Sequence, residues 1–316
     1  MMYFIYIFTF AFIFFGTNVL INYSLPVMGN IFKEIPNERS SHTTTKLKSG
    51  GLFFIFFILI SNIIESIFFG LREINQIIFF CSLLALVGLI DDLFLLSAKI
   101  RYLMQLIVSF LIVNTIYPNL LLEKNFILLF PLLFLGTVTI NFINFIDGID
   151  GLLTGCSIPI LLFNQFQVLD IQIINILGSL LAFLKWNWEP SKIFMGDCGS
   201  NFLGALIFYF ILSKDQYFID FKIFFIILPI FIDCAWCILR RFFNRENIFI
   251  AHKKHLYQRL NQSNISHSNV ALIYIVICFI NFIISFQINL NIFIYISIIE
   301  ILFLIYLDKS IAKKFN

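Results

Sequence analysis

The chain consists of long apolar runs separated by short polar segments. A helix needs about 17 to 25 residues to cross the roughly 30 Å hydrocarbon core of a bilayer, although broken or tightly packed helices can be shorter. Eleven runs predict membrane-spanning helices, or ten if two boundaries are redrawn: 2–23, 51–69, 76–90, 102–117, 125–143, 152–166, 171–185, 200–212, 222–238, 270–286 and 288–307. The pattern predicts an all-α, polytopic membrane protein with a single domain over residues 1–316.

The composition supports this interpretation. Hydrophobic residues make up 60% of the chain and charged residues 12%, whereas an ordinary soluble domain has about 25% charged residues. The 43 phenylalanines and so few charges exclude a cytosolic globular protein or a disordered chain. The net charge of +3 is too small to indicate nucleic acid as a partner.

The basic residues fall mainly on one predicted face of the membrane, which we call the basic face. It would carry 17 of the 21: Lys33, Arg39, Lys46, Lys48, Lys99, Arg101, Lys185, Lys192, Arg240, Arg241, Arg245, Lys253, Lys254, Arg259, Lys309, Lys313 and Lys314. Cytoplasmic loops are enriched in Lys and Arg, so this face is expected to be cytoplasmic, with the N-terminus outside. No basic residue precedes Lys33, which favours a retained first helix over a cleaved signal peptide.

The six cysteines lie in or beside apolar runs and are expected to pack as small apolar residues. Cys234 and Cys237 form a C-x-x-C pair, but a zinc or redox site would need a second pair and a hydrated loop. We therefore expect no metal site at these cysteines.

Five segments of the basic face are richer in polar and glycine residues than a connector requires. They are Asn37–His42 continuing to Lys46–Gly51, Gly88–Asp92 continuing to Lys99 and Arg101, Asn141–Gly151, Trp186–Ser200, and Arg240–Arg241 through Ala251–Leu260.

Carboxylates are prominent in three of these segments. Asp91 and Asp92 close an apolar run, where an ionised side chain at the helix centre would cost roughly 2.5 to 3.5 kcal/mol. Asp147 and Asp150 would share a face of a helical turn, and Asp197 precedes a new helix. A solvated helix end, a plain turn and an N-cap would explain these residues one by one. If the loops converge, five carboxylates on one face suit Mg²⁺ or Mn²⁺.

The last polar segment is basic. His252, Lys253, Lys254, His255 and Arg259 lie within one short stretch. Positive charge alone could be cytoplasmic anchoring, but histidines that alternate with Lys and Arg can also hold a phosphate group. Carboxylates that bind a divalent ion, opposite a basic loop, are typical of phosphoryl or pyrophosphoryl transfer.

The order and wording of these motifs resemble the polyprenyl-phosphate N-acetylaminosugar-1-phosphate transferases, a membrane branch of glycosyltransferase family 4 that includes the phospho-N-acetylmuramoyl-pentapeptide transferases. The resemblance covers about residues 36–260. Asn-Glu-Arg-Ser-Ser-His (37–42) and His-Leu-Tyr-Gln-Arg (255–259) look most like the branch that initiates O-antigen synthesis. Such enzymes make lipid-linked sugars for O-antigen, capsule or cell-wall glycans.

Two departures separate the chain from the muramoyl-pentapeptide branch. That branch places a lysine three residues after the second aspartate, where this chain has Leu95 and the nearest substitute is Lys99. Its triple histidine is interrupted here by Lys253 and Lys254. In the first segment, Lys46–Gly51 also differs from the Thr-Pro-Arg-Gly-Gly-Gly common in the family.

The resemblance implies that the phosphate of undecaprenyl phosphate attacks a UDP-N-acetylaminosugar in the lipid bilayer, releasing UMP. Asp91, Asp92 and Asp197 would be catalytic and hold Mg²⁺, with Mn²⁺ as a substitute. Substrate would contact Asn144, Asp147, Asp150, Lys99, His252, His255 and Arg259. A homodimer is a further candidate assembly, although the sequence does not determine the oligomeric state.

Two other classes of protein would explain the apolar pattern. A transporter or lipid-linked sugar flippase has a similar number of helices, but such folds usually show internal repeats and charges near the midplane, whereas these motifs lie at helix ends. A structural membrane scaffold would leave the carboxylates unexplained.

Overall fold

The computed structural model describes residues 2–28, 33–34, 46–122, 126–212, 219–248, 250, 252–287 and 290–315. The first predicted motif, residues 37–42, lies outside the described residues. The helices are α1 (Met2–Met28), α2 (Gly51–Phe69), α3 (Glu73–Phe94), α4 (Ala98–Ile116), α5 (Asn119–Leu122), α6 (Phe126–Ile146), α7 (Leu152–Gln167), α8 (Ile171–Asn187), α9 (Gly196–Ile211), α10 (Phe221–Ile226), α11 (Leu228–Phe243), α12 (Leu256–Asn261), α13 (His267–Ile284) and α14 (Leu290–Ser310). Strands β1 (Lys33–Glu34) and β2 (Lys46–Leu47) pair antiparallel, with Lys33 opposite Leu47.

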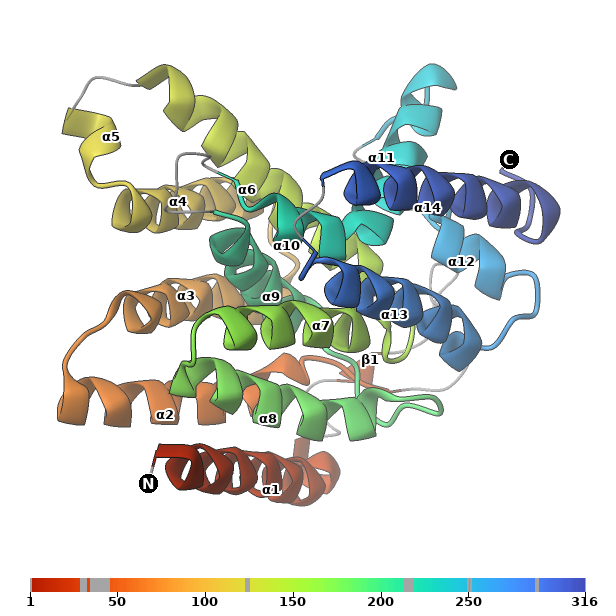
Figure 1. The fold of residues 1–316 in the computed structure, drawn as a ribbon. Helices are drawn as coiled ribbons and strands as arrows, with labels where there is room; N and C mark the ends of the chain where they lie inside the picture. The colour runs from red at the N-terminus through yellow and green to blue at the C-terminus, as the bar shows by residue number, and fades with distance from the viewer. Residues whose placement is uncertain are drawn as a thin grey trace.

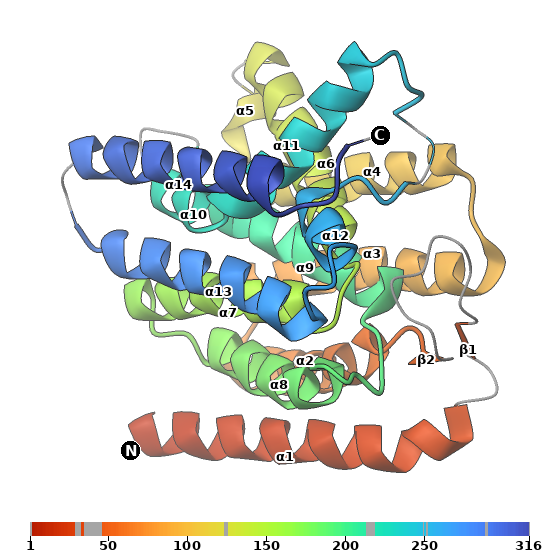
Figure 2. The ribbon, with the colours of Figure 1, turned by 90° about the vertical axis from the view of Figure 1, so that its right-hand side faces the viewer.

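The long helices lie roughly side by side, stacked in Figure 2 from α1 at the bottom through α8, α7 and α13 to α14. The two short strands lie at one end of this stack (Figure 2). Helix α9 runs through the middle (Figure 1) and is buried along almost its whole length. A helix satisfies its interior backbone hydrogen bonds within one segment, which the interior of a bilayer requires.

Over its described residues, each of the eleven predicted apolar runs is mostly helical, which confirms the all-α fold. The run 222–238 is divided into α10 and α11 at Ile227. Pro229 explains the break, because its ring has no N–H to donate to the carbonyl of Phe225 and collides with that carbonyl. The expectation of one continuous helix there was wrong.

Seven helices of the described chain are long and apolar enough to cross a membrane: α1, α2, α3, α4, α6, α13 and α14. The remaining predicted segments form α7, α8, α9 and the α10–α11 pair. Helices α7, α9 and α11 each have 16 residues and α8 has 17, or about 25 Å at 1.5 Å per residue. Helices α7, α8 and α9 are mostly buried among the other helices, whereas α11 exposes Trp236, Leu239 and Phe242 on one side. The structure fits a polytopic membrane protein.

Polar contacts near the chain ends place both termini relative to the basic face. The Tyr6 hydroxyl, near the start of α1, donates to the carbonyl of Leu169 in the α7–α8 loop. Lys313, beyond α14, donates its backbone N–H to the carbonyl of Arg259. The N-terminus therefore lies opposite the basic face, and the C-terminal tail lies on it.

Helices α3 and α9 approach closely because glycine occupies their contact. A Cβ atom on Gly88 of α3 would overlap the backbone carbonyl of Asp197 at the start of α9. Gly51 of α2 meets Gly199 of α9 in the same way. Small residues at these positions bring the end of α3 and the starts of α2 and α9 together.

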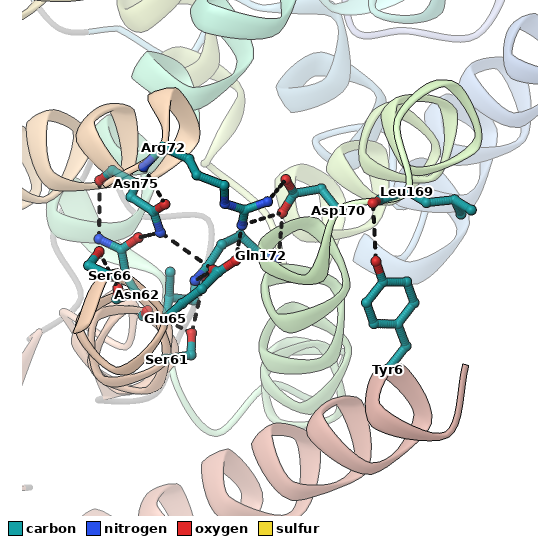
Figure 3. Close-up of polar contacts among 11 residues, drawn as sticks. Tyr6, Ser61, Asn62, Glu65, Ser66, Arg72, Asn75, Leu169, Asp170 and Gln172 are labelled. Carbon is teal, nitrogen blue, oxygen red and sulfur yellow. Dashed lines mark hydrogen bonds and ion pairs between the residues drawn. The ribbon is translucent and has the colours of Figure 1, made fainter. Parts of the chain in front are cut away.

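A polar cluster around Arg72 joins α2, α3 and α8 (Figure 3). It lies at the ends of α2 and α3 that are opposite to the glycine contacts. Arg72 contacts both Glu65 and Asp170, and its Nη1 is 2.9 Å from Asp170 Oδ2. Asp170 also caps α8 by accepting the N–H of Gln172 at 2.8 Å. Because Glu65 and Asp170 are buried, Arg72 supplies the positive charge that their carboxylates need.

The glycine contact predicts the effect of Gly88→Ala. Alanine favours a helix interior over glycine by about 1 kcal/mol, but the overlap with backbone should outweigh this gain and destabilise the protein by about 1 to 3 kcal/mol. The melting temperature of the detergent-solubilised protein measures the change. Gly178→Ala in α8 is the control, because its Cβ would lie 3.0 Å from the nearest atom, Phe10 O. Equal melting temperatures for the two variants would contradict the close contact.

The polar cluster around Arg72 predicts that Arg72→Met lowers stability. The substitution leaves two buried carboxylates without their cation, but the Arg72 side chain is 40% exposed, so solvent screening reduces the loss to about 1 to 3 kcal/mol. Lys309→Met, at an exposed position of α14, is the matched control and should leave the melting temperature unchanged. If Arg72→Met and Lys309→Met have the same melting temperature, Arg72 does not neutralise Glu65 and Asp170 as proposed.

Candidate active site

Asp92 joins the end of α3 to the start of α9. Its carboxylate accepts the backbone N–H groups of Asp197, at 3.2 Å, and Cys198, at 3.4 Å. Lys48 Nζ lies 2.9 Å from Asp92 Oδ1, and the Ser49 hydroxyl donates to Oδ2 at 2.7 Å. The side chain is only 1% exposed, so Asp92 acts as a buried cap on α9 from a neighbouring helix.

The turn that begins α9 needs glycine to accommodate Asp92. Gly196 has φ of +72°, a conformation that favours glycine. A Cβ atom there would lie 2.6 Å from Asp92 Oδ2. Glycine at position 196 of the sequence Met-Gly-Asp-Cys-Gly-Ser (195–200) thus leaves room for the carboxylate of Asp92.

Asp91 lies beside Asp92 but faces the start of α4. Its Oδ1 accepts the backbone N–H of Leu96 at 2.6 Å, and its Oδ2 accepts from Arg101 Nη1 at 3.0 Å. The same Arg101 nitrogen is 4.0 Å from Asp197 Oδ2. Arg101 therefore bridges two carboxylates, and its side chain is 43% exposed.

Asp197 occupies the first turn of α9 and is the accessible member of the group. Asn144, near the end of α6, donates to Asp197 Oδ1 at 3.2 Å and to the Ser200 hydroxyl at 2.9 Å. The Asp197 side chain is 27% exposed. Burial, followed by the charge of Asp92, raises the pKa of Asp197 to about 7.

These contacts confirm that the second, third and fourth predicted segments converge. We call Asp91, Asp92 and Asp197 the carboxylate cluster. Among the described residues, its three carboxylates face two cations, Lys48 and Arg101, and the charge of Asp92 adds to burial in raising the pKa of Asp197. A divalent cation fits this donor set, with the partly exposed Asp197 as the carboxylate best placed to bind it.

Asp150 takes part in a separate group. Lys46 Nζ lies 3.1 Å from its carboxylate, and Ser191 donates both its backbone N–H and its hydroxyl. Burial alone would raise the pKa of Asp150, but hydrogen bonds from His267 and Ser191 and the charge of Lys46 hold it well below the usual range. Among the described contacts, none joins Asp150 to the carboxylate cluster.

The turn that contains Asp147 contacts the last predicted segment. Asp147 donates its backbone N–H to the carbonyl of Asn144 at 3.3 Å. The Tyr257 hydroxyl donates to the carbonyl of Phe145 at 2.7 Å, and a Cβ on Gly148 would overlap that hydroxyl. The end of α6 therefore lies between the carboxylate cluster and the histidine-containing segment.

The start of α12, in that segment, is held by Asp233 of α11. The Asp233 carboxylate accepts the N–H groups of Leu256, at 2.7 Å, and Tyr257, at 3.1 Å, and the hydroxyl of Tyr274 at 2.7 Å. His255 is only 3% exposed and packs against the ring of Phe145, with ring centroids 5.8 Å apart.

The two histidines of this segment lie together. The rings of His252 and His255 stack with centroids 4.9 Å apart. Burial and the neighbouring His255 lower the pKa of His252 to about 4, so its imidazole is neutral at pH 7. Neutral imidazoles can donate or accept a hydrogen bond, but they add no positive charge.

Arg259 and Lys99 lie apart from the cluster. Arg259 is buried, pairs with Asp308 of α14 and donates to the carbonyl of Lys313 at 2.8 Å. Lys99 is exposed on α4, two residues before Arg101. In the described structure, Arg101 and Lys48 place the positive charge beside the carboxylates.

The sequence reasoning did not assign site roles to Lys48, Ser49 or Arg101. Arg101 stands in the second motif, but neither charge nor spacing distinguished it from Lys99. Helical periodicity offered a signal, because Lys99 and Arg101 are two residues apart on one helix and therefore cannot face the same partner.

Comparison with known proteins identifies the family. The model of "Glycosyl transferase family 4" matches residues 74–214. A "probable undecaprenyl-phosphate N-acetylglucosaminyl 1-phosphate transferase" of Bacillus subtilis (strain 168) is 33% identical over 300 residues, 88% of this chain and 83% of the relative. An "undecaprenyl-phosphate alpha-N-acetylglucosaminyl 1-phosphate transferase" of Thermotoga maritima is 29% identical over 231 residues, 72% of each chain. A "phospho-N-acetylmuramoyl-pentapeptide-transferase" of Dictyoglomus thermophilum is 30% identical over 197 residues, 56% of this chain and 62% of the relative. These relatives and the converging motifs confirm the resemblance, and the chain belongs to glycosyl transferase family 4 as a membrane-embedded transferase.

Proposed function

We propose that this enzyme transfers an N-acetylaminosugar 1-phosphate from a UDP-sugar to a polyprenyl phosphate such as undecaprenyl phosphate. UMP leaves, and a lipid diphosphate sugar remains for O-antigen, capsule or cell-wall glycan synthesis. The observation that carries the proposal is the carboxylate cluster at the helix ends, where Asp197 is partly exposed beside Arg101. The names of the relatives support the same donor and acceptor classes.

Asp197 would be the principal ligand of Mg²⁺, with Mn²⁺ as a substitute. The bound ion would neutralise charge on the diphosphate, which is the main requirement of phosphoryl transfer. Asp91 lies across Arg101 from Asp197 and would either join the ion or activate the lipid phosphate. Arg101 has further N–H groups and is exposed enough to hold a phosphate.

Asp92 would act mainly as a positioning residue that holds the start of α9 against α3. Both of its oxygens are occupied by Lys48, Ser49 and the two N–H groups that begin α9. Those N–H groups would otherwise be available to an anion. We propose that Asp92 fixes Asp197 against α3 and leaves phosphate binding to Arg101 and the ion.

The remaining candidate residues divide by their contacts. Asn144 orients Asp197, and Asp147, Lys99, His252 and His255 would approach the nucleotide, the diphosphate or the sugar. Asp150 and Arg259 would shape the site from within the protein, because Lys46, Ser191 and Asp308 already neutralise or bind their charged groups.

The orientation in the cell membrane belongs to the same proposal. The predicted basic face would be cytoplasmic, because soluble UDP-sugars are made there and positive loops favour that side. The polyprenyl chain would lie against the helices while its phosphate reaches the carboxylate cluster from the bilayer.

Asp197→Asn should abolish the activity. Purified enzyme in detergent would receive undecaprenyl phosphate, Mg²⁺ and each of a panel of UDP-N-acetylaminosugars, and UMP release would be measured. The expected loss for Asp197→Asn is at least about 10²- to 10³-fold, as for removal of one electrostatic stabiliser. Chelation of Mg²⁺ should have a similar effect on the wild type.

Asp220→Asn is the matched control. Asp220 also begins a helix, α10, where it accepts the N–H of Lys222 at 2.8 Å, but it lies at the opposite end of α9. This variant should retain activity. Absence of UMP release by wild type with every sugar would refute the transferase assignment, and full activity of Asp197→Asn would refute its metal role.

Cysteine labelling tests the orientation. All six native cysteines are buried, so an impermeant maleimide should report mainly on engineered positions. Gln167→Cys, at the end of α7, should label in intact cells, whereas Ser97→Cys and Gln262→Cys should label only after permeabilisation. These three positions are exposed. Labelling of Ser97→Cys and Gln262→Cys from outside would reverse the proposed topology.

A further inference from the structure

Three potential metal ligands gather where α11 meets the segment that precedes α12. Cys237, His252 and His255 each present one ligand atom, and these atoms all lie within 4.8 Å of one another. Cys237 is buried on α11, whereas the two histidines precede α12. The fold supplies the partners that sequence reasoning found missing for the C-x-x-C pair.

His255 provides a second observation that points to a ligand. Its side chain is buried, and within the described structure its Nδ1 has no hydrogen-bond partner. That nitrogen lies 3.7 Å from Asp233 Oδ1, beyond hydrogen-bond range but close enough for a small movement to join them. A metal-ligating histidine commonly donates its other ring N–H to a carboxylate in this way.

The donor set determines the class of ion. Two imidazoles and a thiolate favour Zn²⁺, whereas Mg²⁺ prefers oxygen ligands such as those of the carboxylate cluster. Zn²⁺ sites with three protein ligands leave one position for water.

We propose that Cys237, His252 and His255 bind a zinc-like divalent cation, and that the bound ion inhibits the enzyme by withdrawing both histidines from substrate. The inhibitory part rests on the proposed function, whereas the metal site does not. On binding, the Cys237 thiol releases its proton to water and its sulfur coordinates the ion.

Binding requires modest local adjustment. Bonds of about 2.0 to 2.3 Å to one ion would draw the ligand atoms together by about 1 Å. His252 Nδ1 now accepts the backbone N–H of Lys254 at 3.2 Å, and coordination through Nε2 would transfer the ring proton to Nδ1 and end that contact. Nearby Arg241 and Lys254 both pair with Glu246, so their charges oppose the ion less than free cations would.

The test uses the full-length purified enzyme in detergent. Zn²⁺ binding would be measured by equilibrium dialysis and metal analysis, and Co²⁺ would replace Zn²⁺ to reveal a thiolate-to-metal absorption band. Wild type should bind one equivalent of Zn²⁺ and show the band. Cys237→Ala should bind at least tenfold more weakly and lack the band.

Cys234→Ala is the matched control, because Cys234 is buried one turn earlier on α11 and contacts the carbonyl of Phe142 instead. It should behave like wild type. Equal Zn²⁺ affinity in Cys237→Ala and wild type, or no thiolate band in wild type, would overturn the site. If Cys237→Ala fails to fold by gel filtration, His252→Ala replaces it, and an unchanged Co²⁺ spectrum in that variant would overturn the site as well.

Activity tests the inhibitory part separately. At saturating Mg²⁺, Zn²⁺ should inhibit UMP release by wild type and Cys234→Ala, and Cys237→Ala should need at least tenfold more Zn²⁺ for the same inhibition. Equal inhibition of all three would overturn this part. If no UMP is released under any condition, the proposed function fails, and the Co²⁺ spectrum still decides the metal site.

Discussion

The candidate site depends on the hydrogen bonds that Asp92 accepts from the backbone of Asp197 and Cys198. A helix begins with N–H groups that have no partner within the helix, and in a buried setting they must be satisfied. Here a carboxylate from another helix satisfies them, and Gly88 lets the two backbones approach. Because the cap and the functional carboxylate are neighbours, the contact that begins α9 also positions Asp197.

Within the described part of the chain, the carboxylate cluster is incompletely neutralised. Three carboxylates meet two cations, so the folded protein keeps negative charge where water is partly excluded. The cluster around Arg72 has the same balance of charge, since Glu65 and Asp170 share that one cation, but its two carboxylates are buried and have further hydrogen bonds to Gln172. The carboxylate cluster differs in that one of its carboxylates, Asp197, is 27% exposed beside Arg101, which suits it to bind an ion and a phosphate.

The apolar runs predicted the helices well because each segment must satisfy its backbone within lipid, a local requirement. The break before Pro229 was also locally encoded but was overlooked within an apolar run. Charge and loop order predicted the convergence of Asp91, Asp92 and Asp197. Pairings such as Asp150 with Lys46 or Arg259 with Asp308 could not be predicted, because they depend on which side chains meet across distant segments.

The end of α6 links the two groups of metal-ligating side chains. Asn144 contacts Asp197, and the next residue, Phe145, packs against His255 and accepts from Tyr257. One group offers oxygen donors and the other offers nitrogen and sulfur, so ions of different character would be sorted between them. Because Asn144 and Phe145 are adjacent in α6, a movement of the histidines would be transmitted to the residue that orients Asp197. If both proposed sites bind their ions, the proximity of the groups would couple the identity of the ion to substrate binding.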